Sequence, residues 1–448
     1  MVTTPLDIGA RAATPVAPGP LGVLPGGSML WFRRHPHAFR ALARYGDVVQ
    51  FRVGPLFVIL LNHPDHVREL LVMQQKNFVK GWGPQKGNTA LGSGLLTNEG
   101  DEHRNRRRLI QPGFHRERLA AAAVVVAKEA ARAASSWSDG QAVRMHREML
   151  HLTMTVAAGA LLGSGASLSV DELARASDAV INRFSPFMFP YAGLLRRLPL
   201  PGRRRSRKGR ARLDDMARSL IAERRLRPGS DLLSMLIAAT DEQGEPLSDA
   251  QIRDELVTFF IAGHETAAVA LTWTWRLLAK NPGIQKRMQE EVDTVTGGRL
   301  PEFDDLPRLR FTEAVLRESM RLFPPKWMLG RRALSACTIG GFRIPAGALV
   351  LASPYVIQRD KRFYDHPESF DPDRWATTVD PLPFSYFPFG GGGRRCVGEG
   401  FAWMEGTLTL ATLAQKWTFN AAHRLTFDFR PSVILRPRRD DLLTAQKR

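Results

Sequence analysis

The sequence predicts a mainly α-helical protein with smaller β-sheets, folded as a single interlocked unit. From about residue 64 to 330, apolar residues recur three and four positions apart, the spacing of a helix with one buried face. Runs of β-branched and aromatic residues precede this region and return after residue 335. Because β-rich stretches flank the helical region on both sides, we expect no separable domains. We take the proline- and glycine-rich residues 1–28 as a loose N-terminal arm and residues 29–448 as the folded unit.

The individual elements follow from the same patterns. Val48–Val53 and Leu56–Leu61 flank Gly54-Pro55, which predicts a β-hairpin. We expect further strands over residues 338–344 and 349–353, separated by a turn at 345–347, and a terminal β region over 425–436. Helical spacing predicts helices over residues 64–73, 116–137, 169–184, 210–225, 310–322 and 399–411.

One predicted helix is much longer than the others. Ser248-Asp249-Ala250-Gln251 has the residue types of a helix start, and Asn281-Pro282 ends the apolar pattern. The helix between them has roughly 30 residues, more than most helices of globular proteins.

Composition excludes several classes of protein. The 448 residues are 44% apolar and 24% charged, as in an ordinary globular protein, which excludes a disordered, collagen-like or disulfide-scaffold protein. Lys and Arg number 63 against 44 Asp and Glu, a formal charge of +19, yet no zinc-finger spacing or aromatic RNA motif occurs, so we expect no nucleic-acid partner. Two cysteines, no signal peptide and no apolar run of about 20 residues favour a soluble, cytoplasmic protein without a transmembrane anchor.

Two neighbouring segments have unusual composition. Residues 184–191 are aromatic and proline-rich, and we favour the lid of an apolar pocket over contact with a lipid surface. Residues 203–210 carry a dense run of Arg and Lys, which we interpret as a solvated loop or helix start rather than a site for an anionic surface.

The stretch 387–398 is the most informative in the chain. Four consecutive glycines allow the backbone to approach another group closely. Cys396 follows two arginines and precedes a predicted helix; both features lower a thiol pKa, and a thiolate binds metal ions. A flexible glycine loop beside an incidental cysteine is the alternative. A phosphate cradle is disfavoured, because no Gly-Lys-Ser/Thr sequence follows the glycines.

Five residues of this stretch match the pattern F-x-x-G-x-R-x-C-x-G at every specified position, namely Phe389, Gly392, Arg394, Cys396 and Gly398. The stretch thereby resembles the haem-binding loop of the cytochrome P-450 family, with glycine at position 393, where the family often has proline. The resemblance implies the cytochrome P-450 fold, in which the long central helix crosses the haem. It also implies haem b as cofactor, with the Cys396 thiolate as the iron ligand that favours O–O cleavage.

A second motif lies within the long predicted helix. Residues 262–266 (Ala-Gly-His-Glu-Thr) resemble the family signature A-G-x-[DE]-T, which places Ala262 beside the cofactor. The resemblance implies that Glu265 and Thr266 are catalytic and deliver protons to dioxygen. Thr266 can also turn its hydroxyl inward and loosen the helix near Gly263. We expect His264 to be structural.

Further residues match the family in the same order along the chain. Glu318 and Arg321, three apart on a helix, together with Arg374 resemble the family's E-x-x-R and P-x-R arrangement, which implies a folding role. Haem carries two propionates, which need cations. His103 and Arg107 resemble the family's W-x-x-x-R pair on a predicted helix, and Arg331 and Arg394 are the other candidates for binding the cofactor.

The resemblance implies a haem-thiolate monooxygenase, of a kind found in bacteria, that inserts one oxygen atom from O2 into an apolar organic substrate. A terpene-like molecule or another natural product is favoured, and a steroid, polyketide or fatty acid remains open. We expect the pocket walls over about residues 79–97, 183–192, 259–262 and 327–329, which include Trp82, Trp327 and Met328. The alternatives are an enzyme that uses peroxide or catalyses another haem-thiolate reaction, and a non-catalytic haem-binding protein.

The electrons are expected from NAD(P)H through an acidic ferredoxin or flavodoxin with its reductase. About 50 residues follow Cys396, too few for a flavin or iron–sulfur domain, so we expect a separate donor protein. The arginines of residues 104–108 would attract an acidic partner, which accounts for part of the net positive charge.

Overall fold

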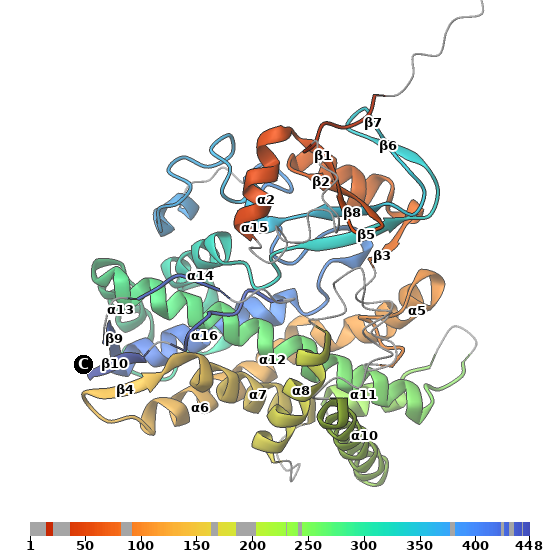
Figure 1. The fold of residues 1–448 in the computed structure, drawn as a ribbon. Helices are drawn as coiled ribbons and strands as arrows, with labels where there is room; N and C mark the ends of the chain where they lie inside the picture. The colour runs from red at the N-terminus through yellow and green to blue at the C-terminus, as the bar shows by residue number, and fades with distance from the viewer. Residues whose placement is uncertain are drawn as a thin grey trace, which may run out of the picture.

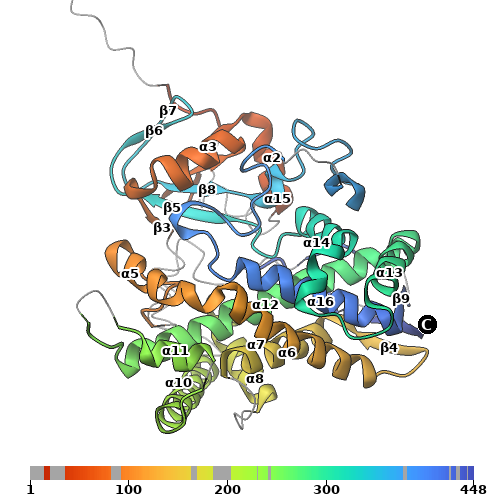
Figure 2. The same cartoon turned by 180° about the vertical axis from the view of Figure 1, so that it is seen from behind.

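The computed structural model describes residues 15–20, 36–81, 92–162, 169–184, 203–229, 231–240, 244–376, 381–422, 425–429, 434–440 and 442–448. The long helix α12 (Asp249–Lys280) runs through the middle of a helical layer, with a five-stranded sheet on one side and a smaller sheet near its C-terminal end (Figures 1 and 2). Residues 15–20 contact the larger sheet region: Gln50 N–H donates to Pro18 O at 2.9 Å. The expected arm boundary at residue 28 lies outside the described residues.

Helices make up most of the described chain. They are α2 (Pro36–Leu42), α3 (Pro64–Arg68), α5 (Gly100–Ile110), α6 (Arg116–Ser135), α7 (Met145–Leu162), α8 (Val170–Phe184), α10 (Arg203–Leu226), α11 (Leu232–Ala238), α12, α13 (Pro282–Thr296), α14 (Arg310–Leu322), α15 (Pro354–Ile357) and α16 (Glu399–Lys416). Short helical turns are η1 (Ala43–Tyr45), η2 (Glu69–Met73), η3 (Gln75–Asn77), η4 (Gln111–Phe114), η6 (Phe303–Arg308), η7 (Pro372–Trp375) and η8 (Gly392–Arg394).

The larger sheet joins segments that are far apart in the sequence. Its strand order is β1-β2-β8-β5-β3, formed by β1 (Val48–Val53), β2 (Leu56–Leu61), β8 (Leu349–Ala352), β5 (Leu329–Ala333) and β3 (Phe78–Lys80). β2 and β8 pair in parallel and the other neighbours pair antiparallel. A second sheet has the order β4-β10-β9, from β4 (Gln141–Arg144), β10 (Leu442–Lys447) and β9 (Trp417–Ala421). This arrangement confirms the predicted interlocked fold with small sheets.

Local chemistry sets both ends of α12, as predicted. The Ser248 hydroxyl accepts from the Gln251 N–H at 3.3 Å, and the Gln251 side chain accepts from the Ser248 N–H at 2.9 Å, which makes a capping box. α12 packs along α7 and contacts α10, α14 and α16. By length and composition α12 could cross a bilayer, but 83% of its most apolar window is buried inside the protein. It is therefore the core helix of this fold.

Two strand predictions were wrong. Residues 338–344 do not form one strand, because Gly340 and Gly341 adopt φ values of 56° and 81° and turn the chain between β6 (Cys337–Ile339) and β7 (Phe342–Ile344). The described part of 425–436 forms no strand beyond one bridge at Phe429. It packs on α12 instead, where Trp273 Nε1–H donates to Leu435 O at 2.7 Å. The C-terminal strands lie on either side of it, as β9 and β10.

The structure tests only one of the two predictions made for the segments of unusual composition. Of the aromatic segment 184–191, residues 185–191 lie outside the described part of the chain, so the lid prediction is not tested. The basic run 203–210 forms the beginning of α10, and most of its described arginine and lysine side chains are exposed. This confirms the predicted solvated helix start.

Candidate active site

The cysteine loop is held close to η2 by its glycines. Gly392 has a φ of +64°, and a Cβ there would lie 1.8 Å from Leu71 O, so only glycine fits. Arg395 N–H donates to Gly392 O and Cys396 N–H donates to Phe389 O, both at 3.0 Å. These bonds fix the backbone of Cys396 immediately before α16 begins.

The Cys396 side chain has exposed surface area, although the protein around it acts strongly on its thiol. Burial raises the pKa of the Cys396 thiol, and the Gly398 N–H, Arg107 and Arg395 lower it by less. The expected net lowering of this pKa is therefore wrong, because desolvation outweighs the two arginines.

α12 presents an open face in its middle. Ala262 and Gly263 are exposed and Thr266 is half-buried, although most side chains of this helix are buried. A Cβ at Gly263 would have no atom within 4 Å. The Thr266 hydroxyl donates to Ala262 O at 2.8 Å and lies 3.4 Å from Gly263 O, as expected for an inward-turned threonine. The open face offers room for a bound molecule.

The two residues before Thr266 point into the protein. Glu265 is fully buried, and its carboxylate accepts a hydrogen bond from Arg436 Nε–H in an ion pair. His264 is buried, and its Nδ1 contacts Phe260 O. His264 is therefore structural, as expected, whereas Glu265 sits in a charged contact that local sequence gave no reason to expect.

Cations gather where β3, β5, α5 and the cysteine loop meet. β3 and β5 pair so that Lys80 stands opposite Arg331. His103 is buried beside them, and burial together with the charges of Arg394 and Lys80 lowers the pKa of His103 to about 3. His103 is therefore neutral at physiological pH and offers a hydrogen bond rather than a charge.

This cation cluster, which we define as Lys80, Arg331 and Arg394, is not fully neutralised by the described residues around it. Its carboxylate neighbour is Glu99, which forms an ion pair with Arg394 and accepts from the Lys80 N–H at 2.7 Å. Three basic side chains thus face one carboxylate, and burial together with the charge of Arg394 lowers the pKa of Lys80 well below its ordinary value. In addition, Arg394 Nη1 is buried without a hydrogen-bond partner in the described part of the chain. A bound group that carries carboxylates would give these basic side chains further anionic partners and could accept from Arg394 Nη1.

A positively charged groove lies on the outer side of α5. It encloses about 410 Å³ between α5, η4 and the cysteine loop. Arg107 Nη1–H donates to Arg395 O at 2.6 Å and so links α5 to the cysteine loop. The residues that line the groove are His103, Arg104, Arg107, Arg108, Gln111, Pro112, His115 and Gly393.

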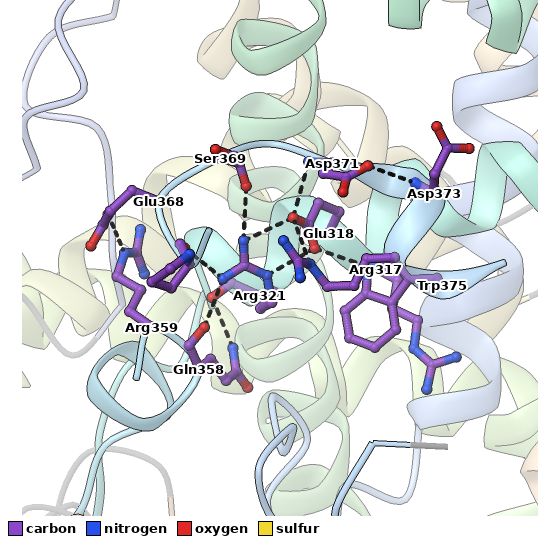
Figure 3. Close-up of polar contacts among 12 residues, drawn as sticks. Arg317, Glu318, Arg321, Gln358, Arg359, Glu368, Ser369, Asp371, Asp373 and Trp375 are labelled. Atoms are coloured by element: carbon purple, nitrogen blue, oxygen red, sulfur yellow. Dashed lines mark hydrogen bonds and ion pairs between the residues drawn. The ribbon is translucent and has the colours of Figure 1, made fainter. Parts of the chain in front are cut away.

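Behind the cysteine loop, Glu318 and Arg321 form a fully buried ion pair (Figure 3). Arg321 donates to both Glu318 oxygens at 2.8 Å and also to the carbonyls of Gln358, Pro367 and Ser369. Arg374 Nε and Trp375 Nε1 lie 3.5 and 2.9 Å from Glu318, respectively. Because every group has a partner, this cluster stabilises the fold, as predicted.

The family of the chain follows from comparison with known proteins. A model of the Cytochrome P-450 family matches residues 17–444. The chain therefore belongs to the cytochrome P-450 family and is a haem-dependent monooxygenase. This confirms the family, the fold class and the enzyme class expected from the motifs.

Relatives include "Cyclooctatin synthase" of Streptomyces melanosporofaciens, 38% identical over 96% of this chain and 93% of the relative. "Pentalenene oxygenase" of Streptomyces avermitilis is 35% identical over 90% of each chain. The solved structure of a cyanobacterial CYP120A1 with retinoic acid bound aligns with a TM-score of 0.85 and 25% identity, over 97% of this chain and all of that one.

The residues present fit a haem. The thiol of Cys396 and the middle of α12 are exposed, and the cation cluster has more basic side chains than carboxylates, which suits the two propionates of a haem. Of the eight residues expected at the site, Ala262, Thr266 and Cys396 have exposed or half-buried side chains, and His103, Arg331 and Arg394 lie at the cation cluster. Arg107 lines the groove beside α5, as His103 also does, and Glu265 is buried against Arg436.

Sequence reasoning missed two lysines. Lys80 enters the cation cluster only because β3 pairs with β5, some 250 residues later in the chain. Lys326 follows Pro324-Pro325, and burial and Arg331 lower its pKa to about 8. A lysine inside an otherwise apolar stretch was the available signal for Lys326, and no local signal existed for Lys80.

Proposed function

We propose that Cys396 is the axial thiolate ligand of haem b and that the haem lies between the cysteine loop and the open face of α12. The observation that supports this proposal is an exposed Cys396 thiol and an open middle of α12, together with a cluster of three basic side chains around one carboxylate. His103, Arg331, Arg394 and Lys80 would hold the two propionates. Ala262 and Gly263, which carry little or no side chain, would leave room above the haem.

The bound haem supplies the activation of O2 that inserts one oxygen atom into an organic substrate. Thr266 holds a hydroxyl at the open face, where its Oγ1 can pass a proton toward that space. Glu265 supplies a carboxylate one residue earlier, and Arg436 keeps that carboxylate in a buried ion pair. We assign proton delivery to Glu265 and Thr266. The presence of both residues favours a monooxygenase over an enzyme that uses peroxide and over a haem carrier without turnover.

The substrate we propose is a terpene-like natural product. The names of two Streptomyces relatives refer to cyclooctatin and pentalenene oxidation, and these proteins cover most of this chain. Trp327, Met328 and Leu329 supply apolar side chains in the expected wall. Steroids, polyketides and fatty acids are the competing substrate classes. Titration of each class into the haem-loaded protein, followed by the shift of the Soret band, compares how tightly they bind.

We further propose that an acidic ferredoxin or flavodoxin, reduced by NAD(P)H through its reductase, docks on the groove beside α5. Arg104, Arg107 and Arg108 line this groove, next to the loop that carries Cys396. Complementary charge would speed association and make it sensitive to salt. Such a donor is consistent with a cytoplasmic enzyme.

The first test is the visible spectrum of the purified protein, reduced with dithionite under carbon monoxide. We expect a Soret band at the position typical of thiolate ligation, and its loss in Cys396→Ser. A band typical of imidazole ligation in the wild type, or a failure to bind added haem, would overturn the assignment. Product formation with a surrogate ferredoxin and its reductase then tests turnover, and absence of any oxidised product would favour the non-catalytic alternative.

A further inference from the structure

The first turns of α10 carry a basic patch, which we define as Arg204, Arg205, Arg207 and Lys208. All four side chains are exposed, and in the described part of the chain none of them forms an ion pair or a hydrogen bond. Arg204 precedes Arg207 and Lys208 by three and four positions, so these three share one face of the helix. On the buried side, a Cβ at Gly209 would lie 2.9 Å from Ala176 O, because α10 packs closely on α8.

The later arginines of α10 have carboxylate partners. These ion pairs are Arg212–Glu172, Arg218–Asp215 and Arg225–Asp249, at 2.6, 2.8 and 2.6 Å, respectively. The sequence offers no such partner near the basic patch. Between Asp178 and Asp214 the chain has ten Arg and Lys residues and no Asp or Glu, so this stretch carries more than half of the formal charge of +19. Positive charge is therefore concentrated at one end of α10.

The basic patch is unfavourable for the helix that carries it. Cations in the first turns oppose the helix dipole, whose N-terminal end is positive, and like charges three or four positions apart repel each other. The first turn of α10 contains no acidic residue that would offset either effect. An anion outside the chain would offset both, because it attracts all of these cations.

The position of the patch separates it from the expected site of the electron donor. α10 lies at the edge of the helical layer away from the larger sheet (Figures 1 and 2). The cysteine loop lies against the turns beside that sheet, where the Gly393 N–H donates to Gln75 Oε1 at 3.0 Å. An acidic ferredoxin at the basic patch would therefore be remote from Cys396. An anionic bilayer, in contrast, attracts adjacent basic residues without needing a shaped pocket.

We propose that the basic patch binds the anionic headgroups of a lipid membrane, so that the enzyme associates reversibly with the membrane surface. The choice of a membrane over another polyanion rests on the proposed function, because an apolar, terpene-like substrate dissolves in a bilayer. The exposure of the patch leaves its cations available to such a surface. The association is sensitive to salt, because the attraction is screened within about 8 Å at physiological ionic strength.

The test is sedimentation of the haem-loaded enzyme with vesicles of phosphatidylcholine, with and without phosphatidylglycerol. We expect binding only to vesicles that contain phosphatidylglycerol, and its loss at high salt. A basic residue near an anionic surface raises partitioning roughly fivefold. Replacement of the whole patch should therefore weaken binding at least about 25-fold, even if only two of the four residues touch the surface. The substitutions are Arg204→Gln, Arg205→Gln, Arg207→Gln and Lys208→Gln.

The control variant removes the same number of charges at exposed, paired cations of α6 and α13. Its substitutions are Arg116→Gln, Arg132→Gln, Lys286→Gln and Arg287→Gln. Since the two variants have equal net charge, the control should bind vesicles as the wild type does. Both should retain the carbon monoxide spectrum of the wild type, which shows that a loss of binding does not come from misfolding.

Three results would overturn the inference. The first is wild-type protein that binds neither kind of vesicle, or both equally. The second is unchanged binding after replacement of the patch, which would place the lipid contact elsewhere, for example at the groove beside α5. The third is binding to a DNA duplex without binding to anionic vesicles. Failure of the proposed function is distinguishable, because the carbon monoxide spectrum needs no vesicles, and a normal thiolate band in a protein that ignores them removes only this inference.

Discussion

Glu265 and Thr266 are adjacent on α12 but have different surroundings. The Glu265 carboxylate is fully buried in an ion pair with Arg436, whereas the Thr266 side chain is half-buried beside the open face of the helix. The hundred-degree turn per residue of an α-helix produces this division. A buried carboxylate and a half-buried hydroxyl are thereby kept next to each other, and only the hydroxyl lies beside the open face.

Thr266→Ala should uncouple electron use from product formation. Without the hydroxyl, protons reach the open face without control, so we expect product per NAD(P)H to fall severalfold and peroxide to rise. The measurement is the ratio of product and peroxide to NAD(P)H consumed. Thr274→Ala is the control, since Thr274 makes the same hydroxyl-to-carbonyl bond at a buried position of α12. Unchanged coupling in Thr266→Ala would refute the assigned role.

Arg394→Met should weaken haem binding. It removes one of three clustered cations and the buried Nη1, so we expect haem transfer to apomyoglobin to accelerate by about tenfold or more, equivalent to roughly 1.4 kcal/mol. Arg395→Met is the matched control, because Arg395 is exposed and pairs with Glu399. Equal transfer rates for the two variants would contradict our placement of the propionates.

His103 should make the stability of the haem-free protein depend on pH. Its pKa is about 3 in the folded protein and about 6.5 when unfolded, so between these values the unfolded state binds the extra proton. The contribution of His103 to the free energy of unfolding is therefore fully present above pH 6.5. It is lost as the pH falls toward 3, at up to about 1.4 kcal/mol per pH unit. Denaturant unfolding at pH 7 and pH 5.5 measures this slope.

The matched variants for that measurement are His103→Asn and His151→Asn. His151 is an exposed histidine of α7, so its replacement should keep the wild-type slope. His103→Asn should flatten the slope, and a slope equal to that of the wild type would show that His103 is not the group responsible.

Glu318→Gln should destabilise the protein strongly. It leaves the buried Arg321 without its ionic partner, and breaking a buried ion pair costs about 3–5 kcal/mol. We expect loss of folded, haem-binding protein at 37 °C, followed by circular dichroism and haem content. Asp373→Asn disrupts an exposed pair with Arg287 and should cost at most about 1 kcal/mol. Similar stability of the two variants would contradict the folding role.

Glu255→Ala should loosen the segment that leads into α5. Glu255 accepts from the Leu95 N–H at 2.9 Å and lies 3.5 Å from Arg106, while the neighbouring Asp254 accepts from the Ser93 N–H at 2.7 Å. We expect hydrogen exchange over residues 92–98 to accelerate by at least about tenfold, because removing the acceptor costs roughly 1–3 kcal/mol. Glu290→Ala, at an exposed carboxylate, should leave exchange there unchanged. Unaltered protection in Glu255→Ala would mean that other contacts hold the segment.

Features that depend on neighbouring residues were predictable from the sequence. The bounds of α12 follow from the Ser248 capping box and from Asn281-Pro282, and the β1–β2 hairpin follows from two apolar runs around Gly54-Pro55. Short motifs also carry the expected site positions Cys396 and Thr266. In each case, the deciding interaction lies within a few residues along the chain.

Tertiary structure alone decided the rest, because the partners are distant in sequence. Lys80 meets Arg331 through strand pairing, Glu265 meets Arg436 through packing, and Pro325 O accepts a hydrogen bond from the Leu435 N–H of the C-terminal segment. The pKa of Cys396 rises because desolvation, which depends on the whole fold, outweighs the neighbouring arginines. The sequence by itself thus determined the family and the position of the thiol, and the fold determined the charges around the open space.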